Sequence, residues 1–219
     1  MTFRVVRAMI GKDLLRETRT GEVVLGGVGL SLTVILIFAF AFPAGAVGYE
    51  HAAAALWVAI LVATQVSLSR SVEIERSNGR LETLRSLGID PGLFYLAKSC
   101  SLFASMLLLL LPTLLACAFF FQIPAGQVPG LAGVVLLGGV GLALAGPLPV
   151  WLGSASKIRE VLTPMLSFVI FIPFLITAVM ASRDILEGNG FSSAGMTLAA
   201  FDFVVGGTAL LLAPAVLED

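Results

Sequence analysis

Long apolar runs alternate with short polar connectors along the whole chain. A helix needs about 20 mostly apolar residues to cross ~30 Å of hydrocarbon, and six runs approach or exceed that length. These runs lie at about 23–41, 52–69, 99–121, 129–152, 161–181 and 196–217. No connector is long enough to bury a core of its own. The pattern therefore predicts an all-α integral membrane protein, with six transmembrane helices in one domain over residues 1–219.

The segment before the first run, residues 1–22, has the pattern of an amphipathic helix. Its apolar side chains recur at helical spacing, and Lys12, Arg16 and Arg19 lie roughly opposite them. This predicts a helix in the membrane interface, with its cations toward anionic headgroups. A solvated leader helix is the alternative interpretation.

The polar segment 70–98, between the second and third runs, predicts a second amphipathic helix. Leu81, Leu84 and Leu87 repeat at helical spacing, whereas the residues between them are mostly polar. Asp90-Pro91 then provides an N-cap and a proline at the first helical position, so the third long helix should begin there. The segment is either a docking element for a soluble partner or an interfacial loop that only connects two spans.

Composition agrees with a membrane protein and gives its orientation. The chain is 58% hydrophobic and 12% charged, with a mean hydropathy of +1.02, whereas soluble domains carry about 25% charged residues. Alternate connectors hold twelve of the 13 basic residues, and the remaining one is Arg183. By the positive-inside rule, both termini and the 70–98 and 153–160 connectors are cytoplasmic.

Asp202 is the polar residue that the pattern explains least, because it lies inside the last apolar run. A charge at mid-depth costs roughly 2.5 to 3.5 kcal/mol on insertion scales. Asp202 is then either a functional intramembrane residue, or it lies near the interface because connector 182–195 folds back as a short outer re-entrant helix. We prefer the second interpretation.

Motifs for catalysis are absent from the sequence. It contains no metal-ligand cluster, no phosphate-binding glycine loop and no Ser/His/Asp set, so we expect no enzymatic activity and no metal. Cys100 and Cys117 lie in one predicted helix, ~25 Å apart by the 1.5 Å rise, so they cannot pair. Buried free thiols are the expected state. The glycines of Gly26-Gly27-x-Gly29 should allow close helix packing.

One family resemblance covers essentially the whole chain. Its strongest part is Asn78-Gly79-Arg80-Leu81-Glu82-Thr83-Leu84 ahead of Leu96-Ala97-Lys98, combined with the six runs and the basic first segment. These features resemble the CcmB family, the haem exporter B permeases of cytochrome c maturation, which are short relatives of ABC-2-type transporter permeases.

The resemblance implies a permease subunit in the bacterial inner membrane that pairs with a separate CcmA-like ATPase subunit. CcmC- and CcmD-like membrane subunits and a second copy of the chain are the other implied partners, with no nucleic acid. Such a complex exports haem, or releases a haem-loaded chaperone, at the outer face. ATP would then bind the partner, haem would be cargo, and this chain would bind no cofactor of its own.

The resemblance also implies which residues contact the ATPase, through a cytoplasmic coupling helix between spans two and three. They are Glu73, Glu75, Arg76, Gly79, Leu81, Glu82, Leu84 and Arg85. In that interpretation the leucines fill a pocket and the charges set the orientation. His51, at the outer end of span two, is a candidate haem ligand, although a lone histidine there is more often an interfacial polar residue.

Two other classes of function stay open at this point. An ion-coupled secondary transporter would show intramembrane charges and paired interrupted helices, for which Asp202 alone is slender support. A membrane scaffold subunit that transports nothing would use the 70–98 segment equally well.

Overall fold

A computed structural model describes residues 11, 22–42, 49–77, 91–149 and 159–218 of the chain, and within these ranges all the long elements are α-helices. Their bounds are α2 Glu22–Ala41, α3 Tyr49–Ser77, α5 Pro91–Phe120, α6 Val128–Ala145, α8 Arg159–Leu186 and α9 Ser193–Glu218. The predicted helix in residues 1–22 lies outside the described residues apart from positions 11 and 22, and so does the predicted helix in residues 78–90.

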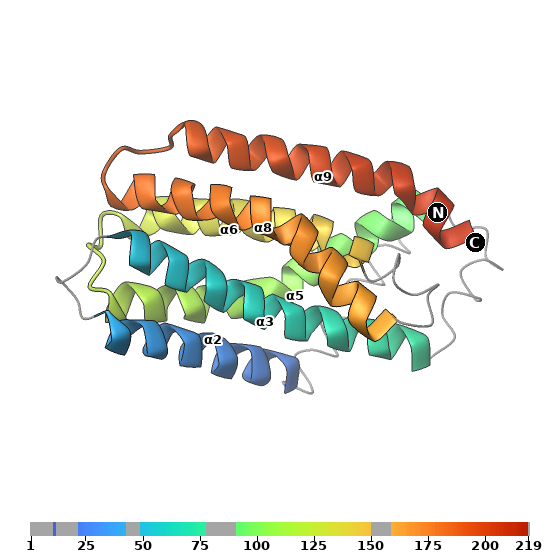
Figure 1. Ribbon diagram of the computed structural model, residues 1–219, viewed down its shortest axis with the longest axis horizontal. Helices are drawn as coiled ribbons and strands as arrows, with labels where there is room; N and C mark the ends of the chain where they lie inside the picture. The colour runs from blue at the N-terminus through green and yellow to red at the C-terminus, as the bar shows by residue number, and fades with distance from the viewer. Residues whose placement is uncertain (1–10, 12–21, 43–48, 78–90, 150–158, 219) are drawn as a thin grey trace.

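The helices lie side by side in a bundle, and each runs antiparallel to the one before it (Figure 1). Helices α3 and α5 contact each other and occupy the middle of the bundle. Helix α2 packs on one side against both of them, and α9 packs on the other side against α5, α6 and α8. The connections 121–127 and 187–192 lie at one end, whereas α5 and α8 begin at the opposite end.

Among the residues that the structure describes, four helical segments are long and apolar enough to cross a membrane: Gly92–Phe120, Val128–Pro149, Met165–Leu186 and Ser193–Leu212. A shorter apolar segment, Leu25–Ala41, belongs to α2. The all-helical membrane class is confirmed, whereas the number of six spans stays a prediction. Helix α5 begins at Pro91, as the Asp90-Pro91 pair predicts.

The predicted re-entrant helix between residues 182 and 195 is wrong. Helix α8 continues through this polar stretch to Leu186, and its exposed Arg183 pairs with Glu187 one turn later. The turn follows only at Gly188 and Gly190, whose φ angles of +84° and +69° favour glycine. Polar residues therefore extend the exposed end of a helix here rather than ending it.

Helix α9 begins directly after this turn because Ser192 caps it. The Ser192 hydroxyl accepts a hydrogen bond from the backbone N–H of Ala194 at 3.1 Å and donates one to the carboxylate of Asp184. This is the usual arrangement for an N-cap serine, and it satisfies one of the free N–H groups of the first turn. As a result Asp202 lies near the middle of the apolar segment Ser193–Leu212 and not near its end.

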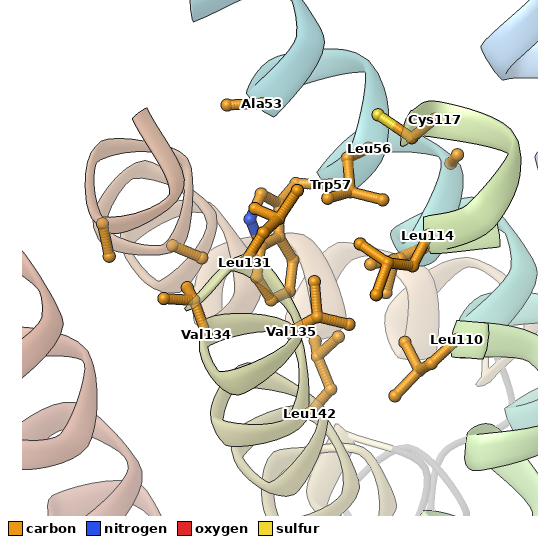
Figure 2. Close-up of a cluster of buried hydrophobic side chains, with 14 of the residues drawn as sticks. Ala53, Leu56, Trp57, Leu110, Leu114, Cys117, Leu131, Val134, Val135 and Leu142 are labelled. Carbon is orange, nitrogen blue, oxygen red and sulfur yellow. The ribbon is translucent and has the colours of Figure 1, made fainter. Parts of the chain in front are cut away.

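Trp57 of α3 is the central side chain of the core. It is completely buried, and Figure 2 shows it facing Leu131, Val134 and Val135 of α6. Its indole Nε1–H donates a hydrogen bond to the hydroxyl of Ser182 on α8 at 2.8 Å. One side chain thus joins three helices, and its polar group is satisfied away from water, as buried polar groups require.

Glycines on α6 allow its neighbours to approach closely. A Cβ atom at Gly138 would collide with the Trp57 ring, and one at Gly139 would lie 2.8 Å from Cδ1 of Leu110 on α5. Gly27 of α2 likewise allows Leu109 of α5 to approach closely, because a Cβ atom at Gly27 would lie 2.9 Å from Cδ2 of Leu109. The glycine motif in the first run therefore serves helix packing at one of its positions, since a Cβ at Gly26 or Gly29 would meet nothing.

Large apolar side chains cover the outside of the bundle. Leu25 and Phe40 on α2, Val169 on α8, and Phe203 and Leu211 on α9 are all more than 70% exposed. A soluble protein rarely exposes so much contiguous apolar surface, whereas lipid tails cover it at no cost. The outer surface and the helix lengths together identify a multi-pass membrane protein.

The two cysteines are free, and both lie on α5, as the sequence predicts. Their environments differ from the expectation that both are buried. Cys117 is completely buried, with its Sγ 3.6 Å from the carbonyl oxygen of Ala52, whereas Cys100 is exposed. Although α5 contacts four other helices, it has an exposed face that also carries Leu96 and Leu111, and Cys100 lies on that face.

Substitution of Gly138 should destabilise the bundle, because the indole ring of Trp57 fills the space that a Cβ atom needs. We expect Gly138→Ala to cost ~1 to 3 kcal/mol, the usual cost of overpacking a core. In a Cys100→Ser background, the temperature at which the buried Cys117 reacts with a thiol-specific dye reports this loss. Gly133→Ala is the matched control on the same helix, since a Cβ there would meet nothing within 4 Å. Equal melting temperatures for the two variants would contradict the packing of Trp57 on α6.

Candidate functional site

The residues implied as ATPase contacts fall into two groups. Glu73, Glu75 and Arg76 belong to the last turns of α3, which the structure describes as a helix up to Ser77. The others, at Gly79, Leu81, Glu82, Leu84 and Arg85, lie outside the described residues. The structure therefore brings the first three onto one helix and leaves their relation to the leucines as a prediction.

Helix α3 connects this segment to the core of the bundle. The same continuous helix carries Trp57 in the core and Arg76 near its end, ~29 Å further along at 1.5 Å per residue. Because a helix is stiff along its axis, a displacement at the end of α3 reaches the contacts of Trp57. The arrangement can transmit force along the helix axis.

Basic residues gather at the end of the bundle where α3 ends. Arg70 and Arg76 lie in the last turns of α3, Lys98 lies in the first turns of α5, and Arg159 begins α8. Figure 1 places these helix ends together. At the opposite end, the described residues contain one basic side chain, Arg183. The charge asymmetry of the sequence is thus an asymmetry between the two ends of the bundle.

His51 lies in the first turn of α3, at the end opposite these basic residues. Its ring packs against Phe42 with 4.6 Å between centroids, and its Nδ1 atom is buried without a hydrogen-bond partner among the described residues. No group of three or more His, Cys, Asp or Glu side chains that could hold a metal occurs in the described part of the chain. The histidine therefore packs on an aromatic ring and belongs to no cluster of metal ligands among the described residues.

Asp202 lies in the interface between α9 and α6, inside the apolar part of the bundle. Only 5% of it is exposed, and a Cβ atom at Gly141 would collide with its carboxyl oxygen Oδ1. The same Cβ would lie 2.7 Å from Cε2 of Phe174 on α8. The carboxyl group of Asp202 thus packs against Gly141, and the ring of Phe174 lies beside the same glycine.

The carboxyl group of Asp202 is buried without a hydrogen bond in the part of the chain that the structure describes. Neither oxygen has a hydrogen-bond partner among the residues that the structure describes. An ionised carboxylate that is buried without a partner costs several kcal/mol, so burial of this kind is rare unless the group has a function. Asp202 is therefore buried within an apolar helical segment, and a functional role for it stays a prediction.

Sequence reasoning missed the surroundings of Asp202. Gly141 and Phe174 come from two other helices, and the sequence gives no indication that they meet Asp202. The cluster Gly138-Gly139-x-Gly141 was the available signal, since glycines in an apolar run mark close helix contacts. Ser182, which pairs with Trp57, was also missed because a serine near a predicted connector is ordinarily solvated.

Comparison with known proteins gives one match over nearly the whole length. The sequence model of the family described as CcmB protein matches residues 4–218. No curated protein sequence matches the chain. The match includes the basic first segment, the polar segment 70–98 and all six described helices, and the family consists of haem-export components of cytochrome c maturation. The chain therefore belongs to the CcmB family.

Proposed function

We propose that the chain is the permease subunit of an ABC transporter for cytochrome c maturation. In this proposal a separate ATPase subunit hydrolyses ATP, and the complex exports haem or releases a haem-loaded chaperone at the outer face of the inner membrane. Family membership supports the haem-export system. The observation that carries the coupling is α3, which runs without interruption from Trp57 in the core into the polar segment 70–98.

The coupling follows from how Trp57 is held. Its indole bonds Ser182 on α8, packs on Gly138 of α6 and meets the ring of Phe174 edge-on at 5.8 Å. Closely packed interfaces respond to force by changing between discrete arrangements, because they cannot deform continuously. An ATPase that moves the end of α3 would therefore shift α6 and α8. Helix α9 packs against both of these helices.

The orientation in the proposal follows the charges. The basic ends of α3, α5 and α8 face the cytoplasm, where the ATPase is, and the 121–127 and 187–192 connections face outward. Helices α2 and α3 supply the first two of six spans, and both termini are cytoplasmic. A second copy of the chain and CcmC- and CcmD-like subunits would complete the complex, and no ATP or metal binds this chain.

Leu84→Asp should release the ATPase subunit without unfolding the spans. The proposal places this leucine in an apolar pocket of the partner, where a carboxylate is disfavoured by desolvation. The measurement is co-purification of the chain with the ATPase encoded beside it, in mild detergent, with ATP hydrolysis followed in the same samples. We expect at least a tenfold loss of bound ATPase at unchanged monodispersity.

Ser86→Asp is the matched control for this variant. It adds the same charge two residues away, on the side of the predicted helix opposite Leu81 and Leu84, so it should retain the ATPase. If both variants lose the partner equally, the segment acts through its charge and not through the leucines. If the wild type binds no ATPase, the proposed coupling fails, and a scaffold or ion-coupled function would explain the chain better.

Cysteine labelling tests the orientation independently of any partner. With Cys100 replaced by serine and Cys117 buried, Asn189→Cys in the exposed 187–192 connection should react with a membrane-impermeant maleimide added to intact cells. Ser86→Cys should react only after the membrane is opened. The reverse pattern would place the 70–98 segment outside, away from ATP, and would exclude the proposal.

A further inference from the structure

The site where the carboxyl group of Asp202 packs against Gly141, here called the seat of Asp202, has two features that simple helix packing does not explain. The side chain is more than nine-tenths buried with both oxygens unpartnered among the described residues, and it points at the one glycine on α6 that leaves room for it. A leucine or alanine would fill an apolar helix contact without leaving polar atoms unsatisfied. The polar group therefore has a use that packing alone does not explain.

Ionised groups are remote from this seat on every helix that packs against α9, within the described residues. Helix α6 has no ionisable side chain between Val128 and Ala145. The charged residues of α8 lie at its two ends, where Arg183 is nine positions from Phe174. On α5 the titratable groups are Tyr95, Lys98 and the two cysteines, and Tyr95 donates its hydroxyl to the backbone carbonyl of Leu144 on α6.

A bound cation would need several oxygen ligands around it. The described contacts beside Asp202 are apolar: its carboxyl group lies against Gly141, the ring of Phe174 reaches the same glycine, and that ring packs on Phe201 with 6.0 Å between the ring centroids. A proton needs only the carboxyl group itself. The neutral acid is also the form that an apolar seat accepts, because a neutral polar group costs far less to bury than an ion.

We propose that Asp202 is a proton-binding site in the membrane interior, closed by the contact between α6 and α9. The carboxyl group holds its proton while it is packed on Gly141. When α6 and α9 separate, water enters, the carboxyl O–H bond breaks, the proton passes to that water, and a hydrated carboxylate remains. Packing against Gly141 and proton release are then mutually exclusive, so the protonation state of Asp202 follows the state of this helix contact.

Infrared spectroscopy of the purified full-length chain tests the bound proton directly. A protonated carboxyl has a C=O stretch that is separate from the amide and carboxylate bands and shifts in heavy water. In a detergent without ester or acid groups, at neutral pH, the wild type should show this band and Asp202→Asn should lose it completely. Asn has nearly the same shape and is neutral, so the packing on Gly141 is retained.

Asp184→Asn is the matched control, because Asp184 is half-buried at the end of α8 and its carboxylate accepts a hydrogen bond from Ser192. This variant should leave the band unchanged. Absence of the band from the wild type, or its survival in Asp202→Asn, would overturn the proposal, since the carboxyl group would then be ionised or another acid would carry the proton.

The link to the helix contact has its own test. Gly141→Ala pushes the carboxyl group out of its seat, so the band should exchange with heavy water at least tenfold faster or give way to a carboxylate band. Gly133→Ala, where a Cβ meets nothing within 4 Å, should exchange like the wild type. If Gly141→Ala does not fold, Phe174→Leu is measured instead. It removes the aromatic ring beside Gly141 and should also speed the exchange of the band with heavy water. Exchange at the wild-type rate in the variant that is measured would show that the contact does not control the proton.

Discussion

The structure depends on the seating of one large side chain, Trp57, against a helix whose facing position is glycine. The ring occupies the space that a Cβ atom at Gly138 would need, and its N–H is satisfied by Ser182. In lipid no hydrophobic force drives helices together, so association relies on close packing and a few interhelical hydrogen bonds. This contact supplies both, and it fixes α3, α6 and α8 relative to one another.

Hydrogen bonds between helices also join other parts of the bundle. The hydroxyls of Ser31 and Thr113 lie 2.8 Å apart and join α2 to α5, and Tyr95 joins α5 to the backbone of α6. Asp202 differs from these three residues, because it lies against a glycine of α6 and its carboxyl oxygens have no hydrogen-bond partner among the described residues. The bundle is therefore held by satisfied polar contacts at several places, whereas the carboxyl group at the contact between α6 and α9 has no hydrogen-bond partner among the described residues.

The sequence predicts the class of the protein well because apolar run length is a direct consequence of bilayer thickness. It also predicts where α5 begins, since Pro91 determines that start locally. It fails for residues 182–195, where charged side chains on an exposed helix end look like a loop, and there the turn depends on Gly188 and Gly190. The seat of Asp202 lies beyond sequence reasoning, because Gly141 and Phe174 reach it through tertiary packing of three helices.

Family membership makes the chain a component of haem export, and in our proposal a partner that hydrolyses ATP moves it through α3. The most direct measurement is the amount of cytochrome c with covalently attached haem in cells that lack this chain, detected by haem staining of membrane proteins. The account predicts that these cytochromes disappear while their apoproteins are still made, and that the wild-type chain restores them. Normal levels of haem-bearing cytochrome c without the chain would contradict it.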